Sequence, residues 1–176
     1  MEDCFISLGG NIGDTFSIME QTVLTIASNK NIKNLISSRL FQTSPVSPIP
    51  QGDYLNAVCR FRTDLTPLEL FTFLQSVEMS MGKANKPKFA PRVIDIDLLF
   101  YGSFSIQHEQ LTIPHPAWHQ RLFVMTPLAD LVDDTFYYKV KDHLNAFTNP
   151  FQEKVQPIAK SLPFESYSLR SLHEKG

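Results

Sequence analysis

The sequence Val93-Ile94-Asp95-Ile96-Asp97-Leu98-Leu99-Phe100-Tyr101 alternates apolar and acidic residues, which is typical of a β-strand. Because successive side chains of a strand point to opposite faces, Asp95 and Asp97 are expected to share one face. The set expected on the other face is Ile94, Ile96, Leu98 and Phe100. The two aspartate Cα atoms would lie roughly 6.5 to 7 Å apart, close enough for both carboxylates to hold one or two hard cations. Alternatively, these aspartates only solvate the outer face of an antiparallel strand.

A basic loop lies directly before this strand. Residues 83–92 read Lys-Ala-Asn-Lys-Pro-Lys-Phe-Ala-Pro-Arg and follow Gly82, the expected end of a helix. An enzyme that handles a polyphosphate needs Mg²⁺ held by carboxylates, and mobile cations that neutralise the remaining phosphate oxygens. The loop and the aspartates together favour such a site over a merely solvated surface segment.

A histidine with a restricted backbone follows the strand. His115 lies between Pro114 and Pro116, which limit the chain on both sides and so fix the direction of the imidazole. Arg121 and Phe123 come shortly afterwards, and they could close a cation and an aromatic ring over the same site. The alternative is an ordinary histidine in an exposed turn.

Composition narrows the class of protein. With 176 residues and 43% hydrophobic content, the chain is long enough for one domain with a full core. Its 16 basic and 18 acidic residues give a formal net charge of -2, which argues against a nucleic-acid partner. No apolar stretch has membrane-spanning length and no signal-like segment is present, so we expect a cytoplasmic protein without a membrane partner. Cys4 and Cys59 are expected to be buried thiols rather than a disulfide.

Further strands and two helices are expected around these motifs. A strand at 4–8 runs into a glycine-rich loop at 9–13, which fails the Rossmann pattern because Leu8 stands where a glycine is needed. The P-loop pattern fails at Gly82 because Val77 stands where its first glycine is needed. Asp14 can cap a first helix, and Thr66 begins a capping box for a second helix. The remaining segments are a strand at 34–42, a proline-rich loop at 43–53, and a strand at 54–64 that places Tyr54 and Asn56 on one face.

Taken in order, these motifs resemble the 6-hydroxymethyl-7,8-dihydropterin pyrophosphokinases, a family of folate synthesis. The resemblance covers about residues 4–135 and rests on blocks with matching spacing. The blocks are Gly9-Gly10-Asn11, Thr43-Ser44-Pro45, Asp53-Tyr54-Leu55-Asn56, Glu78, Pro91-Arg92-Val93-Ile94-Asp95-Ile96-Asp97, and Leu111-Thr112-Ile113-Pro114-His115-Pro116 with Arg121 and Phe123.

The resemblance implies an α/β (α+β) fold with a ferredoxin-like core, mainly an antiparallel sheet with helices packed on its faces. It implies transfer of pyrophosphate from ATP to the hydroxymethyl oxygen of the pterin, giving AMP and the pterin diphosphate. Two Mg²⁺ ions held by Asp95 and Asp97 would bridge the ATP phosphates. Three loops, at 9–14, 44–53 and 83–92, would close over the bound substrates.

The resemblance also implies a role for individual residues. Arg92 and His115 would join the two aspartates as catalytic residues. The implied ATP contacts are Gln75, Glu78, Lys83, Arg92, Leu98, Thr112, His115 and Arg121. On the pterin side, Tyr54 and Phe123 would sandwich the ring, while Asn56 and the chain around Thr43, Pro45 and Val46 would contact its hydrogen-bonding edge.

The third loop departs from the family pattern. The family usually has arginine after the helix-ending glycine and Trp-Gly-Pro-Arg before the strand, where this chain has Lys83, Asn85 and Phe89-Ala90-Pro91-Arg92. Gln110 likewise stands where some relatives carry arginine. Lysine keeps the charge but loses the bidentate fork of arginine. We expect an altered rate or ATP affinity rather than a changed reaction.

Two other functions stay open. A two-metal phosphohydrolase would share Asp95, Asp97 and His115 but would have no use for the pterin-facing aromatic and amide residues. A ferredoxin-like module that binds single-stranded RNA is disfavoured by the acidic pair on the strand face.

The domain organisation has two alternatives at the C-terminus. Residues 1–149 are expected to form the pyrophosphokinase domain, as a monomer. Residues 150–176 show no convincing periodicity, so they either pack on the domain as a tail or form an interdomain linker. In the family that these motifs resemble, the domain is sometimes fused to dihydropteroate synthase, which is compatible with the linker but does not decide between the two alternatives.

Overall fold

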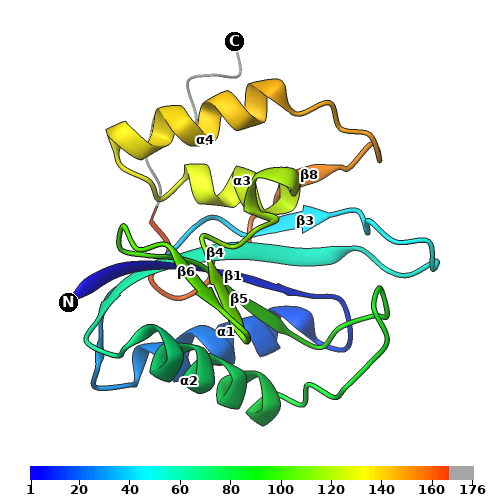
Figure 1. The fold of residues 1–176 in the computed structure, drawn as a ribbon. Coiled ribbons are helices and arrows are strands. Elements are labelled where there is room, and N and C mark those ends of the chain that lie inside the picture. Colours follow the sequence, from blue (N-terminus) through cyan, green and yellow to red (C-terminus); the bar gives the residue numbers. More distant parts are fainter. Residues whose placement is uncertain (167–176) are drawn as a thin grey trace.

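The computed structural model of this protein describes residues 1–166 as a central antiparallel sheet between two helical layers (Figure 1). The sheet has the order β5 (Asp95–Tyr101), β1 (Glu2–Gly10), β4 (Tyr54–Thr63), β3 (Phe41–Thr43) and β8 (Val155–Pro157), and β2 (Ile32–Ser37) also pairs with β4. Helices α1 (Thr15–Ala27) and α2 (Pro67–Ser80) cover one face, and α3 (Leu122–Ala129) and α4 (Asp134–Ala146) cover the other. A separate hairpin of β6 (Ile106–His108) and β7 (Leu111–Ile113) and the short 3-10 helix η1 (Trp118–Gln120) complete the described chain.

The predicted ferredoxin-like core is confirmed. If the short strand β3 is left out, the chain order is β1, α1, β2, β4, α2, β5. The sheet places β5 beside β1, β1 beside β4 and β4 beside β2. This is the βαββαβ arrangement, in which both helices return along the same face of the sheet.

Both predicted helix starts are confirmed. Asp14 caps α1 by accepting the Ser17 N–H at 3.2 Å. Thr66 caps α2 in a capping box, in which its hydroxyl accepts the Glu69 N–H and the Glu69 side chain accepts the Thr66 N–H. The last residue of α2 is Ser80, and Gly82 follows the C-cap Met81 with a φ of +93°, which suits a residue without Cβ.

The expected alternation of the aspartate strand is wrong at Phe100. Ile6 of β1 pairs with Leu98 and Phe5 pairs with Phe100, so Leu99 is an extra residue at a bulge. The bulge reverses the alternation, and Phe100 therefore packs beside α3 and α4 rather than with Ile94, Ile96 and Leu98 beneath α1 and α2. Strand β5 therefore contributes apolar side chains to both cores, Ile96 and Leu98 to one and Leu99 and Phe100 to the other.

The strand expected at 34–42 is instead two strands, β2 and β3. At the break, the Ser38 hydroxyl accepts the Val58 N–H at 2.9 Å, where a backbone carbonyl of a continuous strand would stand. Arg39 then turns toward buried Asp130 and pairs with it at 2.8 Å. The Ser38 hydroxyl and the Asp130 carboxylate, which also accepts the Arg39 N–H at 3.1 Å, therefore satisfy backbone groups at the break.

Part of the segment 150–176 joins the sheet. Strand β8 pairs antiparallel with β3, and buried Leu162 packs in the core beneath α1 and α2. The Ser37 N–H donates to the Phe164 carbonyl at 2.9 Å. Residues 167–176 lie outside the described residues. Within residues 1–166, no helix has the length and apolar content needed to cross a bilayer.

Both thiols are expected to be inert in the folded protein. Cys4 and Cys59 are unpaired and have no exposed surface, and burial raises the pKa of each thiol to about 12. Because the thiolate is the nucleophile, a disulfide reagent at about pH 8 should modify neither residue until the chain unfolds. Counting reacted thiols before and after adding denaturant tests this, and rapid modification of the native protein would contradict the burial described.

Candidate active site

Three neighbouring strands bring polar residues together on the face toward α3. In the sheet register, Gly9 of β1 lies between Asp95 of β5 and Asn56 of β4, and Ser7 lies beside Asp97. Ile94, Ile96 and Leu98 pack in the opposite core. The prediction that the two aspartates share one face is therefore confirmed, and Asn56 shares that face with them.

A cavity of about 460 Å³ lies over this polar row. Its wall brings together nine of the residues predicted for the site, and these are Thr43, Val46, Tyr54, Asn56, Arg92, Asp95, Asp97, Arg121 and Phe123. Carboxylates, cations and aromatic rings thus surround one space. Such a space suits a molecule with both a flat ring and an anionic group.

Other predicted residues lie outside the wall of this cavity, and these are Pro45, Gln75, Glu78, Lys83, Leu98, Thr112 and His115. Gln75 is exposed on α2, and the Leu98 side chain is buried in the core. Leu98 can therefore contact a ligand only through its backbone. Glu78, Lys83 and His115 instead contact the aspartates or the strand that carries them.

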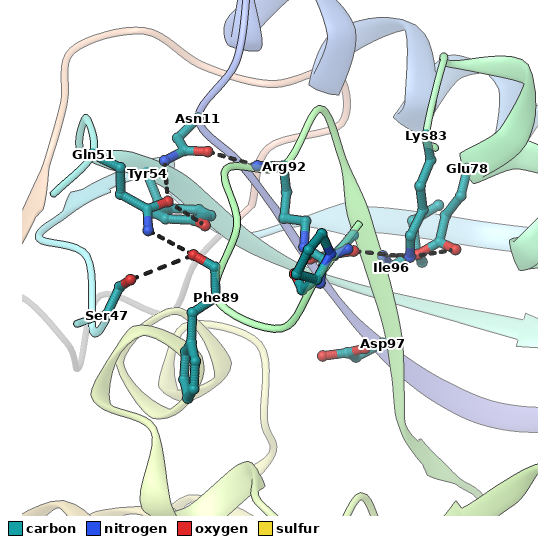
Figure 2. Close-up of polar contacts among 12 residues, drawn as sticks. Asn11, Ser47, Gln51, Tyr54, Glu78, Lys83, Phe89, Arg92, Ile96 and Asp97 are labelled. Carbon is teal, nitrogen blue, oxygen red and sulfur yellow. Dashed lines mark hydrogen bonds and ion pairs between the residues drawn. The ribbon is translucent and has the colours of Figure 1, made fainter. Parts of the chain in front are cut away.

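Asp95 is held by a lysine of the chain itself. Lys83 Nζ lies 2.8 Å from Asp95 Oδ1 and 2.9 Å from Glu78 Oε2 (Figure 2). Burial raises the pKa of Glu78, although the Ile96 N–H and Lys83 act against it. For Lys83, burial acts to lower the pKa, but the hydrogen bonds to Asp95 and Glu78 outweigh it and the pKa is raised. Lys83, which follows the end of α2, is therefore charged, and it neutralises Asp95 at the start of β5.

Asp97 faces an arginine and a histidine. Its Oδ2 lies 3.2 Å from Arg121 Nη1 and 3.8 Å from His115 Nε2. Burial lowers the pKa of His115, and the nearby Arg121 adds to this, while Asp97 opposes both. The Ala117 N–H donates to His115 Nδ1 at 3.1 Å, so the single proton of the neutral ring is on Nε2, which faces Asp97.

The three loops implied by the resemblance contact one another (Figure 2). Asn11 of the first loop accepts the Arg92 N–H at 2.8 Å and donates to Gln51 of the second loop at 2.9 Å. Gln51 in turn donates to the carbonyl of Phe89 in the third loop at 2.9 Å and accepts the Tyr54 hydroxyl at 3.0 Å. The side chains of Asn11 and Gln51 therefore couple all three loops beside the cavity.

The donor set of the aspartate pair suits a hard cation that arrives with a phosphate. Among residues 1–166, no three His, Cys, Asp or Glu side chains are grouped so that they could hold a metal ion by themselves. Mg²⁺ in proteins is commonly held by one or two carboxylates, with phosphate oxygens and water as its other ligands. Asp95 and Asp97 could supply the protein's share of such a shell.

Several cavity residues were not predicted from the sequence. Phe151 and Glu153 come from the segment before β8, and Ala117 and Gln120 come from η1 and the residue before it. The segment 149–154 has no periodicity that would place it over the sheet. Only its pairing through β8 shows that it completes the wall.

Gly9 provides the space for Asn56, which leads to a prediction. A Cβ atom at Gly9 would lie 2.4 Å from Asn56 Oδ1, so alanine must displace that amide. We expect Gly9→Ala to weaken binding of the ring ligand roughly ten- to hundredfold, because the buried amide loses its position. Isothermal titration would measure the change. Gly52→Ala is the matched control, because a Cβ there meets nothing within 4 Å. Unchanged binding in Gly9→Ala would exclude Asn56 as a ligand contact.

Comparison with known proteins gives a consistent family. Residues 5–133 match the family model described as 7,8-dihydro-6-hydroxymethylpterin-pyrophosphokinase (HPPK). The chain is 36% identical over 138 residues to the bifunctional protein FolKE of Lactococcus lactis, an alignment that covers 78% of this chain and 40% of that one. It is 34% identical over 134 residues to the 2-amino-4-hydroxy-6-hydroxymethyldihydropteridine pyrophosphokinase of Haemophilus influenzae, covering 76% and 84% of the two chains.

One longer relative also matches the C-terminal segment. The folic acid synthesis protein fol1 of Pneumocystis carinii is 34% identical over 177 residues, which cover 94% of this chain and 24% of that protein. Among solved structures, an HPPK-DHPS in complex with substrates superposes with a TM-score of 0.62 at 16% identity, covering 86% of this chain and 44% of that chain. The chain thus spans less than half of these longer proteins.

Proposed function

The chain belongs to the 7,8-dihydro-6-hydroxymethylpterin-pyrophosphokinase family, and we propose that it transfers pyrophosphate from ATP to 6-hydroxymethyl-7,8-dihydropterin. AMP and the pterin diphosphate are the products. The observation that carries this proposal is the single cavity that holds Asp95 and Asp97 together with Tyr54, Asn56 and Phe123. A phosphohydrolase needs the carboxylates, but it has no use for paired aromatic rings beside a buried amide.

The aromatic end of the cavity would take the pterin. Tyr54 and Phe123 line the cavity together, and a flat heteroaromatic ring between them would gain stacking energy. Asn56 is buried and donates to Thr43 Oγ1 at 2.7 Å, which fixes the amide for contact with the ring edge. Thr43, Pro45 and Val46 would contact the same edge through their backbone.

The carboxylate end of the cavity would take the triphosphate. Asp95 and Asp97 would hold two Mg²⁺ ions, which supply positive charge to the phosphate oxygens when bound. Lys83 would then leave Asp95, and its ammonium would become available to a phosphate oxygen. Arg92, Arg121 and the Nε2 proton of His115 would neutralise further phosphate charge.

The remaining nucleotide contacts are proposed at the edge of this site. Gln75 and Glu78 lie on α2, Leu98 would contribute its backbone, and Thr112 lies on β7. The interlocked loops would exclude water from the phosphorus, which favours attack by the pterin alcohol over hydrolysis. Because the alcohol proton can leave late in such a reaction, no side chain is assigned as a general base.

The domain proposal concerns the chain's relation to its longer relatives. We propose that residues 1–149 form the pyrophosphokinase domain, on which the segment before β8 packs as part of the cavity wall, and that the domain acts as a monomer or fused to dihydropteroate synthase. The solved HPPK-DHPS structures are examples of such a fusion. The contacts of β8 and Leu162 support a packed tail for the described part of the segment 150–176.

Separating the nucleotide products tests the proposed reaction. The protein is incubated with Mg²⁺ and ATP, with and without 6-hydroxymethyl-7,8-dihydropterin, and the nucleotides are resolved by ion-exchange chromatography. AMP that forms only with the pterin, without ADP, is the expected result. ADP or phosphate released equally in both samples would support the phosphohydrolase and contradict the proposal.

A further inference from the structure

We propose that Glu153 selects the pterin by accepting a hydrogen bond from its exocyclic 2-amino group. This inference rests on the proposed function, and it deepens it by assigning a specificity-determining residue to the C-terminal segment. Glu153 lies beyond residues 5–133, the part of the chain that matches the family model. Its proposed role would therefore extend the pterin site into the C-terminal segment.

The Glu153 carboxylate is buried and incompletely partnered. The residue is only 8% exposed and lies in the wall of the cavity that also contains Asn56, Thr43 and Phe123. Its Oε2 is buried and, within residues 1–166, has no hydrogen-bond partner. A buried carboxylate oxygen without a donor is costly, so its presence beside a ligand cavity indicates that a ligand supplies the donor.

Hydrogen bonds hold the backbone of Glu153 next to the second loop, residues 44–53. The Glu153 N–H donates to Asn149 Oδ1 at 2.7 Å, and Asn149 Nδ2 donates to the Glu153 carbonyl at 3.1 Å. The N–H of the next residue, Lys154, donates to the Ser44 hydroxyl at 2.8 Å, and the Ser44 N–H donates to the Lys154 carbonyl at 2.9 Å. These contacts fix the backbone from which the Glu153 side chain projects.

A purely structural role accounts for only part of these contacts. Burial raises the pKa of Glu153, while the N–H groups of Phe123 and Leu122 at the start of α3 lower it. The Glu153 carboxylate therefore lies near the N-terminal end of the helix that carries Phe123. Within residues 1–166, neither of these N–H groups forms a hydrogen bond to Oε2. The unused oxygen is the feature that points to the ligand.

The chemistry of the pterin fits this oxygen. The 2-amino group is the exocyclic N–H donor of the pterin, and a carboxylate accepts hydrogen bonds from amino groups more strongly than a neutral oxygen does. A ring that lacks this group would leave the buried oxygen unpaired, so the site would reject it. Glu153 would thereby distinguish a 2-amino-4-oxo ring from related rings without the amine.

The test compares two ligands in two proteins. Affinities for 6-hydroxymethyl-7,8-dihydropterin and for its 2-deamino analogue are measured by titration calorimetry, with Mg²⁺ and a non-hydrolysable ATP analogue present. In the unaltered protein, loss of the amine should weaken binding roughly ten- to hundredfold. In Glu153→Gln, the affinity for the parent pterin should fall by a similar factor. Removal of the 2-amino group should then lower the affinity of this variant only slightly further. Glu109→Gln, an exposed position, is the matched control and should behave as the unaltered protein.

The outcomes separate selection from support of α3. A collapse of the preference for the 2-amino ring, with an unfolding temperature that is not lowered, supports the proposal. Equal weakening of both ligands together with a lower unfolding temperature would show that Glu153 only holds α3, and unchanged affinities would also overturn the proposal. If the unaltered protein binds no pterin at all, the proposed function fails as well.

Discussion

Replacing Asp97 by asparagine is expected to lower pterin-dependent AMP formation by a factor of about a thousand or more. Asp97 lines the cavity, and its Oδ2 lies 3.2 Å from Arg121 and 3.8 Å from His115. Asparagine has nearly the same shape but lacks the negative charge that a cation requires. The substitution also leaves Arg121 and His115 without their anionic partner, so the positive charge of the empty site would rise.

The fold should tolerate this change. Asp97 is partly exposed and its side chain lies outside both apolar cores. Steady-state kinetics across a range of Mg²⁺ concentrations would measure the loss, and circular dichroism would establish that the variant is folded. Asp142→Asn, on the exposed side of α4, is the control for removal of one negative charge. Near-normal turnover in folded Asp97→Asn would exclude Asp97 as a metal ligand.

Replacing Arg92 by alanine should reduce turnover by a factor of roughly 10² to 10⁴. The Arg92 side chain lines the cavity, and its Nε lies 3.8 Å from Asp95 Oδ2. Its guanidinium would neutralise charge on the transferred phosphates. The contact that joins the first and third loops is made by the Arg92 N–H, which donates to Asn11 Oδ1, and this bond survives the substitution.

The loss should therefore appear in kcat more than in the KM for the pterin. Arg92→Lys should recover part of the rate, because lysine restores the charge but lacks the fork of donors. Arg62→Ala is the matched control, because Arg62 is exposed and its guanidinium contacts only the Met1 carbonyl among the hydrogen bonds described. A loss confined to pterin affinity would assign Arg92 to loop closure rather than to the phosphates.

Local patterns in the sequence predicted the parts of the site that lie on regular elements. The alternation around Asp95 and Asp97 placed both carboxylates on one face, because a strand allows only two directions. The capping box at Thr66 predicted the start of α2, and Gly82 predicted its end, which lies at Ser80. In both cases, the information lies within a few neighbouring residues.

Features that depend on distant partners could not be predicted in this way. The bulge at Leu99 arises from its pairing with β1, and it turned Phe100 to the opposite face. The break between β2 and β3 depends on Ser38 and on Asp130, far along the chain. Glu153 reaches the cavity only because β8 adds to the edge of the sheet, and no local pattern announces that pairing.

Lys83 shows how a departure from the family pattern acquires a structural meaning. Its ammonium lies between Glu78 of α2 and Asp95 of β5, and it forms an ion pair with each carboxylate. A cation that binds Asp95 must compete with this lysine. We therefore expect Lys83 to alter the strength of cation and nucleotide binding at the site rather than the identity of the reaction.

Tracing the β-phosphorus of ATP is the most direct test of the central claim that a pyrophosphoryl group moves as one unit. The protein is incubated with Mg²⁺, dihydropterin and ATP labelled at the β-phosphorus, and the pterin product is isolated. The label should leave the nucleotide and appear in the pterin product, with unlabelled AMP remaining. If the β-label stays in ADP and none of it reaches the pterin product, pyrophosphoryl transfer is excluded.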